Sequence, residues 1–376
     1  PFYLFSQNLN QLIESSMQNQ LIKSSKYNID SQESEYKSIQ NSYMPKVMFG
    51  ASYSKSDTET ILSANSSITS YISINHTLYD GGKKDAIYDS YKSSIKSANQ
   101  QHISLKNKIT LEVIKYYFNY QSLLSTKEAK QKEIEQLKAQ YNRLNQFLEA
   151  GISTNDEVQK ILSRVEIANV SLHEIELNIQ TILHNLEYLT SKKVTISGDS
   201  SIKKLDTKLD SLRADIKAKE YDIKTILSNA QTIKSLNYPT INLENRFNHY
   251  DFNYNNEIYQ NSAIDSQNIF KVNLSWKLYD FNTTKDKYQS IYKKYQALKS
   301  NYEYEKNKAS VDLHLALKSF DIAKLKINSA KAGLKAANLT YKKIEQKYKN
   351  GLIENIAYLE ALSEKYNAIS ILKNAQ

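Results

Sequence analysis

The sequence contains two copies of one pattern, displaced from each other by 200 residues. The repeated landmarks are the tripeptide LYD at 78–80 and 278–280, the tripeptide KNK at 106–108 and 306–308, and a glycine at 151 and 351. The segments between these landmarks are equal in length, so both copies are expected to fold alike. The sequence therefore predicts two tandem structural repeats, residues 1–200 and 201–376.

Each copy contains one very long segment without helix breakers. Residues 82–150 contain no proline and no glycine after Gly82, and residues 282–350 are interrupted only by Gly333. The whole chain has only 7 Gly and 3 Pro, which is far below average usage. At 1.5 Å per residue, each segment would form a helix roughly 100 Å long. Long helices are therefore predicted at 82–150 and 282–350.

Apolar residues in both long segments step alternately by three and four positions, which is the spacing of a heptad seam. The seam consists of Ile134, Leu137, Tyr141, Leu144 and Leu148 in the first copy and of Leu334, Ala337, Tyr341, Ile344 and Tyr348 in the second. This spacing predicts that each long helix packs as part of a coiled coil.

Shorter helices are expected on both sides of the long ones. Gly151 and Gly351 stand where a helix must stop and turn. The patterns that follow predict helices at 154–190 and 352–376, a further helix at 205–236, and an N-terminal helix at about 7–42. Placed end to end, two such helices match the length of one long helix.

Ahead of each LYD, the period of the sequence changes from helical to alternating. Hairpins are predicted at about 46–79 and 240–279, with strands of about ten residues. This is roughly the length of a tilted transmembrane strand. The clearest apolar face is expected to contact lipid and consists of Phe270, Val272, Leu274, Trp276 and Leu278.

A soluble sheet packed on a core is the alternative for the hairpins. The flanking helices, however, have narrow seams and lack a broad apolar face that could cover such a sheet. Four strands are too few to close a barrel with a usable bore, and open edges are not tolerated in lipid. Several protomers must therefore pool strands: two would give a small barrel, and three would give twelve strands. The predicted fold class is mainly α with a β-barrel part.

The junction LYDGGKK at 78–84, the turns EAGIST at 149–154 and NGLIEN at 350–355, and the tandem copy together resemble the TolC-like outer membrane factor, or outer membrane efflux protein, family. The resemblance covers nearly the whole chain. It implies a homotrimer in the outer membrane of a Gram-negative bacterium. A twelve-stranded barrel would continue as a coiled-coil α-barrel through the periplasm, where its tip contacts an adaptor protein of an inner membrane pump of RND or ABC type. The implied function is passive export in a tripartite efflux or type I secretion system.

The resemblance also implies roles for residues at the two turns. Family tips commonly carry acidic residues that ring the entrance. Glu360 fills one such position, whereas the other matching position holds Ala357. Asp156 and Glu157 are further gate candidates, although carboxylates there also complement the helix dipole, and that structural role is the alternative. The candidates for adaptor contact are Gly151, Ile152, Ser153, Gly351, Leu352 and Ile353.

The sequence offers little to support chemistry. No nucleotide-binding, hydrolase or zinc-protease motif appears, and His173 with Glu176 reads as a surface pair. The chain has no cysteine and a formal net charge of +10, but its lysines are scattered, so no nucleic-acid partner is expected. No apolar stretch suits a membrane-spanning helix, and no signal peptide is evident at Pro1. We predict no enzyme activity, cofactor or metal. The rival interpretation is a soluble coiled-coil structural protein with small hairpins.

Overall fold

The computed structural model describes residues 6–198, 200 and 212–376. The described residues form two compact units. The helical unit takes its residues from Pro1–Lys23, Leu105–Lys208 and Lys308–Gln376, and the strand unit takes them from Ser24–Ser104 and Leu209–Asn307. Two long helices, α3 (Lys83–Glu149) and α7 (Thr283–Lys349), contribute to both units. They occupy the segments predicted at 82–150 and 282–350.

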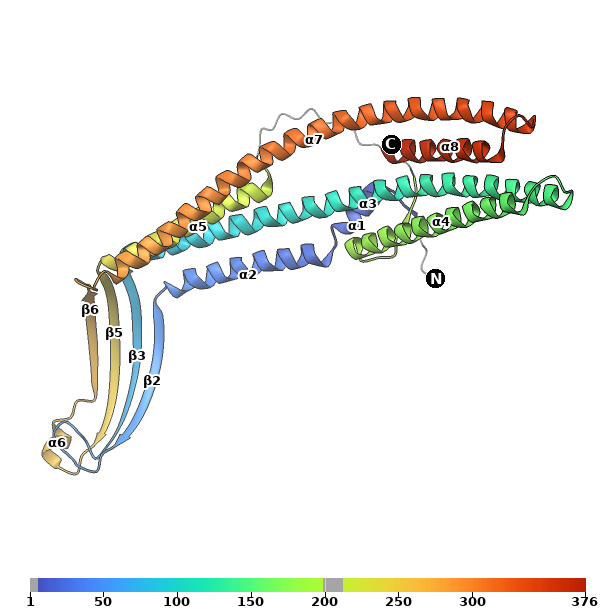
Figure 1. Cartoon of the computed structure of the whole chain (residues 1–376). Helices are drawn as coiled ribbons and strands as arrows, with labels where there is room; N and C mark the ends of the chain where they lie inside the picture. The colour runs from blue at the N-terminus through green and yellow to red at the C-terminus, as the bar shows by residue number, and fades with distance from the viewer. Residues whose placement is uncertain (1–5, 199, 201–211) are drawn as a thin grey trace. The chain divides into compact units, whose positions relative to one another are not determined.

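The strand unit contains one four-stranded antiparallel sheet (Figure 1). Its order is β2 (Lys46–Lys55), β3 (Ser66–Tyr79), β5 (Thr240–Asn253) and β6 (Ser266–Ser275). The hairpin β2–β3 comes from the first predicted repeat and the hairpin β5–β6 from the second, and the two join through β3 and β5. Each hairpin therefore supplies one central strand and one edge strand.

Glu59 joins the loop between β2 and β3 to the loop between β5 and β6. Its carboxylate accepts hydrogen bonds from the backbone N–H groups of Asn255 and Asn256, at 2.7 and 2.9 Å. A short helix, α6 (Glu257–Asn261), lies in the same loop as these amides. The loop of one hairpin thus binds the loop of the other, in addition to the ladder between β3 and β5.

At the other end of the sheet the strand unit is helical. Here α2 (Gln20–Ser42), α5 (Ala214–Lys234) and the first part of α3 pack through polar and aromatic contacts. Ser90 donates a hydrogen bond to Asn229 at 2.7 Å, and the ring of Tyr36 meets that of Tyr88 edge-on with centroids 5.7 Å apart. The first residues of the helix predicted at 205–236, up to 211, lie outside the described residues.

The N-terminal helix predicted at about 7–42 is two helices. Helix α1 (Leu9–Ser16) ends before Asn19, and α2 begins at Gln20. The side chain of Asn19 is buried, donates to the carbonyl groups of Tyr188 and Leu189, and accepts from the backbone N–H of Leu21. It caps the end of one helix and the start of another, because the last carbonyls and first amides of helices lack partners within the helix. This long-range contact interrupts the single helix that the local sequence predicts.

The helical unit has two apolar cores. One lies where α3 and α7 pack against α4 (Asn155–Thr190) and α8 (Asn355–Ala375), and it contains predicted seam residues such as Ile134, Leu137 and Tyr341. The other joins α1, α3 and α4 beside a parallel pair formed by β1 (Ser6–Gln7) and β4 (Thr195–Ile196). The Tyr117 hydroxyl donates to the Gly198 carbonyl near this pair. Five of the ten predicted seam residues are thus buried, and four others pack against the same core while partly exposed.

Candidate functional site

The two faces of the sheet show the reverse of the burial expected for a soluble sheet. On one face, apolar side chains are exposed: Phe49 is 73% exposed and Leu274 is 66% exposed. On the other face, Ser73 and Asn248 are only 2% and 3% exposed. The apolar face consists of Val47, Phe49, Tyr53, Ile68, Ile72, Ile74, Phe247, Phe270, Val272 and Leu274. Such a contiguous exposed apolar surface marks a face made for contact with a partner or a membrane.

The residues expected to face lipid are only partly in a strand. Phe270, Val272 and Leu274 lie in β6 and are exposed, but β6 ends at Ser275, so Trp276 and Leu278 lie beyond it. The expected strand was too long because Ser275 pairs with Thr240, and the next residue of β5 would be Pro239, which has no N–H group to continue the ladder. Trp276 instead donates its indole N–H to the Asn237 carbonyl at 3.0 Å.

The polar face carries a packed cluster at its centre, formed by Gly50, Tyr71, Arg246 and Asn248. The guanidinium of Arg246 lies over the Tyr71 ring, 3.6 Å from its centroid, and its Nε donates to Asn248 Oδ1 at 2.9 Å. A Cβ at Gly50 would stand 2.5 Å from the same ring, so any larger residue there would displace the ring. The sequence analysis did not single out Arg246 because the cluster depends on the register of three strands.

The two glycine turns of the helical unit have the same hydrogen-bonding pattern. Gly151 and Gly351 have φ angles of 73° and 69°, in the left-handed region that glycine adopts most easily. The N–H of each glycine donates to the carbonyl three residues earlier, and the next N–H donates to the carbonyl five residues earlier. These bonds define a Schellman motif. The motif leaves Ile152 and Leu352 72% and 70% exposed, so each turn presents an apolar side chain to solvent.

A groove of 1030 Å³ lies next to these turns, between the first residues of α4 and of α8. Ile152, Asp156 and Glu157 line it on one side, and Asn355 and Ile356 line it on the other. Among the residues predicted for the tip, the groove therefore brings together Ile152, Asp156 and Glu157. Glu360 lies on α8 and is exposed, but it is not part of this lining.

The carboxylates beside the first turn have partners. Asp156 forms an ion pair with Lys160 at 2.5 Å, and Glu157 accepts a hydrogen bond from the Ser153 hydroxyl at 2.6 Å. The backbone N–H of Glu157 donates to the Thr154 hydroxyl, which caps α4. Both carboxylates stand in the first turn of α4, where they also complement the helix dipole. The structure thus shows a local structural role for both carboxylates, and their gate role remains a prediction.

Behind the groove, a buried polar network joins α3, α7 and α8. Gln140 donates to the Tyr348 hydroxyl at 2.6 Å and to Asn355 Oδ1 at 3.2 Å, and the hydroxyls of Tyr341 and Tyr358 are 3.3 Å apart. Burial raises the pKa of Tyr348. On the same helix as Tyr358, burial raises the pKa of Tyr366 to about 12. The hydroxyl groups of Tyr348 and Tyr366 are therefore neutral at physiological pH.

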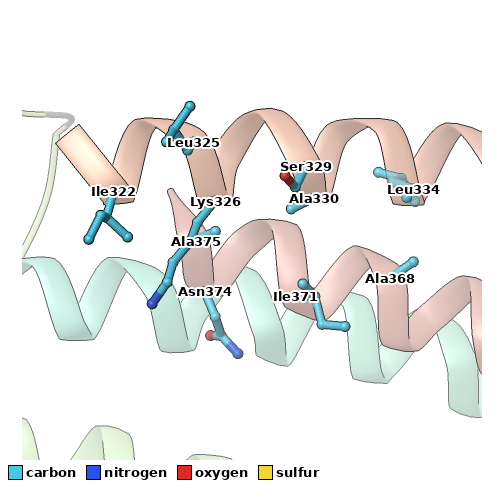
Figure 2. Close-up of a pocket in the computed structure, with 11 residues that line it drawn as sticks. Ile322, Leu325, Lys326, Ser329, Ala330, Leu334, Ala368, Ile371, Asn374 and Ala375 are labelled. Atoms are coloured by element: carbon cyan, nitrogen blue, oxygen red, sulfur yellow. The ribbon is translucent and has the colours of Figure 1, made fainter. Parts of the chain in front are cut away.

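A second groove, of 670 Å³, is apolar and lies between α7 and α8 (Figure 2). Figure 2 shows Ile322, Leu325 and Leu334 on one helix and Ala368 and Ile371 on the other. Leu325 is 65% exposed and Ile371 is 53% exposed. Within the chain, nothing fills this groove among the residues that the structure describes.

Helix α4 has a stripe of exposed apolar side chains. Ile167, Val170, Leu177 and Tyr188 are between 59% and 75% exposed, and their spacing places them at the a and d positions of one heptad register. On α7 the exposed Val311, Leu315, Ile322, Leu325 and Leu339 fit such a register as well. The helical unit therefore has two seams, the α4 seam and the α7 seam, that lack a partner within the described part of the chain.

No helix within the described ranges is long and apolar enough to cross a membrane. Residues 6–198, 200 and 212–376 also contain no group of three acidic or histidine side chains that could hold a metal ion. His173 and Glu176 form the expected exposed pair, with Nδ1 and Oε2 3.4 Å apart.

The exposed apolar face of the sheet and the two long helices define the class as a mainly helical protein whose sheet is built for contact with lipid or a partner. The particular family follows from the sequence, because the pattern of the outer membrane efflux protein family matches residues 12–191 and 208–376. The chain belongs to the outer membrane efflux protein family. The resemblance stated from the sequence is thereby confirmed, and membership places the chain among outer membrane channels, which are not enzymes.

Solved structures agree on the fold. The outer membrane protein VceC from Vibrio cholerae matches with a TM-score of 0.86 at 15% identity, over 98% of this chain and 92% of that one. A membrane protein from Pseudomonas aeruginosa matches with a TM-score of 0.88 at 16% identity, over 98% and 89%. The CmeC outer membrane channel of Campylobacter jejuni matches with a TM-score of 0.87 at 16% identity, over 98% and 82%. No curated protein sequence matches significantly. The predicted fold class, mainly α with a β part, is confirmed.

Proposed function

We propose that three copies of this chain pool their strands into one barrel in the outer membrane, which continues as a helical tunnel in the periplasm and exports solutes passively. The observation that carries this proposal is the reversed burial of the sheet. Exposing apolar surface to water costs about 25 cal/mol per Å², whereas the same surface is favourable against lipid. The polar face would then line a water-filled lumen.

The two edge strands supply the joint between copies. β2 and β6 each have 10 residues, close to the roughly 9–11 that a tilted strand needs to span a membrane. Unpaired backbone groups cost several kcal/mol each in lipid, so both edges require partners. Pairing β6 of one copy with β2 of the next would give the backbone groups of both edge strands hydrogen-bond partners. Three copies give twelve strands and a lumen, whereas two copies would give a barrel filled by its own side chains.

The helical unit also offers surfaces for a neighbouring copy. The α4 seam and the α7 seam both have heptad spacing and are exposed in one chain, and coiled-coil helices bury such residues against each other. In the proposed trimer, the α4 seam of one protomer packs against the α7 seam and the apolar groove of the next. This pairing would close the helices into a tunnel.

The two glycine turns are the proposed contact for an adaptor protein of an inner membrane pump of RND or ABC type. Ile152 and Leu352 are exposed at matching places in two turns that share the Schellman hydrogen bonds, with Gly151, Ser153, Gly351 and Ile353 beside them. Asp156, Glu157 and Glu360 are the proposed gate residues at the periplasmic entrance. The chain would thus be the outlet of a tripartite efflux or type I secretion assembly.

The joint between β6 and β2 can be tested by cross-linking, because the chain has no cysteine. Ser52→Cys in β2 is combined in turn with Gln267→Cys, Ile269→Cys or Lys271→Cys in β6. We expect at least one pair to oxidise in isolated outer membranes into a covalent species of three chains. The species should require detergent for extraction and should form conducting pores in planar bilayers.

The control places both cysteines inside one sheet. Ser67 and Phe252 are paired in the ladder between β3 and β5, so Ser67→Cys with Phe252→Cys should cross-link within a chain and leave its mass unchanged. A protein that stays monomeric and water-soluble, or whose edge pairs yield no species larger than two chains, would exclude the proposed trimer in favour of the soluble coiled-coil interpretation.

A further inference from the structure

The polar face of the sheet carries an excess of positive charge. Strand register places Lys46, Glu244 and Lys271 in one row across this face, and Arg246 in the next row. Three cationic side chains thus share the face with one carboxylate. This balance differs from that of the glycine turns, where Asp156, Glu157 and Glu360 are acidic.

Arg246 is held in one position at the centre of the face. Its guanidinium centre lies over the Tyr71 ring, 3.6 Å from the ring centroid, as in the stacking of arginine on an aromatic face. Its Nε is bound to Asn248 Oδ1, and the Asn248 side chain is itself nearly fully buried, at 3% exposure. Gly50 makes room for the Tyr71 ring from the other side. The arginine therefore loses little freedom when it binds a ligand.

The geometry leaves one edge of the guanidinium free. Stacking uses the faces of the group, and hydrogen bonding uses its edges. One edge donates through Nε to Asn248, and the two Nη nitrogens have no acceptor among the residues that the structure describes. A pair of Nη donors matches the two oxygens of a carboxylate or phosphate. The adjacent row holds Lys46 and Lys271 together with Glu244, so it adds one net positive charge without such directionality.

We propose that Arg246, fixed by Tyr71 and Asn248 and assisted by Lys46 and Lys271, forms an anion-binding site on the lumenal face of the sheet, so that this part of the channel favours solutes bearing carboxylate or phosphate groups. The proposal rests on the proposed channel function, which makes this face the wall of the lumen. A trimer would carry three such sites in one ring.

The test uses the purified full-length channel in planar bilayers, with citrate as the probe. Citrate should block the conductance of the unaltered channel, and Arg246→Gln should weaken the block about tenfold, since a charge-assisted bidentate contact is lost. The chloride-to-potassium permeability ratio in a salt gradient should fall about twofold in the same variant at low salt, where charges are poorly screened.

Two further variants make the outcome specific. Lys55→Gln removes one positive charge from the opposite face of the same sheet and should leave both measurements unchanged. Arg246→Lys keeps the charge but loses the two Nη donors of the stacked guanidinium. It should therefore leave the permeability ratio unchanged while weakening citrate block severalfold. It also replaces Arg246→Gln if that variant assembles poorly.

Failure of this site and failure of the channel function are distinguishable. Pores of normal conductance whose citrate block is the same in the unaltered channel, Arg246→Gln and Arg246→Lys would overturn the anion site alone. An unaltered protein that forms no pores would overturn the channel function and the site together.

Discussion

The carboxylates near the glycine turns differ in what neutralises them. Asp156 is paired with Lys160 at 2.5 Å, so little of its field extends beyond the pair. Glu157 accepts a hydrogen bond from a neutral hydroxyl, that of Ser153, at 2.6 Å, and Glu360 is exposed on α8. If these residues line the proposed entrance, Glu157 and Glu360 should act on passing ions more strongly than Asp156.

Removing charge from Glu157 and Glu360 should therefore lower the cation preference of the entrance. We expect Glu157→Gln with Glu360→Gln to reduce the potassium-to-chloride permeability ratio about twofold at low salt, measured as the reversal potential in a salt gradient. Asp156→Asn combined with Lys160→Gln is the comparison and should have a smaller effect, because it removes an ion pair as a whole and leaves the net charge unchanged. Unchanged conductance and selectivity in the double variant would remove the gate assignment.

Residue-scale reasoning from the sequence found the exposed apolar residues of β6 and the side chains of the turns, because alternation and glycine spacing are local signals. It did not find Arg246 as a site. Arg246 becomes distinctive only through Tyr71 on a neighbouring strand and Gly50 on the next one, and strand register is not encoded in any single segment. The same limit explains Asn19, whose partners Tyr188 and Leu189 are far away in sequence.

Glycine has opposite consequences in different elements of this chain. Gly151 and Gly351 end α3 and α7 with positive φ, where any other residue is strained. Gly333 lies in the interior of α7, and an added Cβ would meet nothing within 4 Å at any of the three positions. Only backbone conformation therefore distinguishes them.

The same substitution should accordingly change sign between these positions. Gly351→Ala should destabilise the helical unit by about 1–2 kcal/mol, the cost of a left-handed conformation for a residue with a Cβ. Gly333→Ala should stabilise it by roughly 0.5–1 kcal/mol, because alanine loses less backbone entropy in a helix. Thermal unfolding in detergent, followed by circular dichroism, measures both. Equal shifts of one sign would contradict the assignment of strain to the turn.

The bounds of helices and strands were predicted from the sequence more successfully than contacts between single residues. The long helices begin and end within one residue of the expected 82–150 and 282–350, because glycine and the LYD junction punctuate an otherwise unbroken pattern. The ends of strands that depend on a neighbouring strand were predicted less well. β6 ends at Ser275 because the residue opposite the next position is Pro239, just before β5. The division of the chain into two sequence repeats remains a prediction, and it is a different division from that into a helical unit and a strand unit.

At the scale of the whole molecule, a single chain is incomplete. Among the residues that the structure describes, both edge strands of its sheet lack a partner, and its helices expose the α4 seam and the α7 seam. Burying an apolar side chain of the size of leucine contributes about 1.5–3 kcal/mol, so several such residues in each seam would give a stable joint. The proposed trimer satisfies sheet edges and seams at once.

A charge placed in the α4 seam should weaken the trimer. Leu177 is 67% exposed in the chain, and Leu177→Glu would bury an unpaired carboxylate in the joint between copies, which is strongly unfavourable. We expect less trimer and more monomer on unheated denaturing gels and in detergent by light scattering. Gln180→Glu adds the same charge to the same helix at a g position, which flanks the a and d residues of the seam, and should leave the trimer intact. Trimers equally abundant in both variants would exclude the α4 seam from the joint.

The carboxylate of Glu59, bound to two amides of the other hairpin, bears on how such an assembly comes together. Because both hairpins are bound to each other at these loops as well as along β3 and β5, each subunit of the proposed trimer would bring its four strands already paired. Closing the barrel would then require only one new pairing of β6 with β2 per subunit. With so few pairings to form, strands have little opportunity to pair in the wrong order.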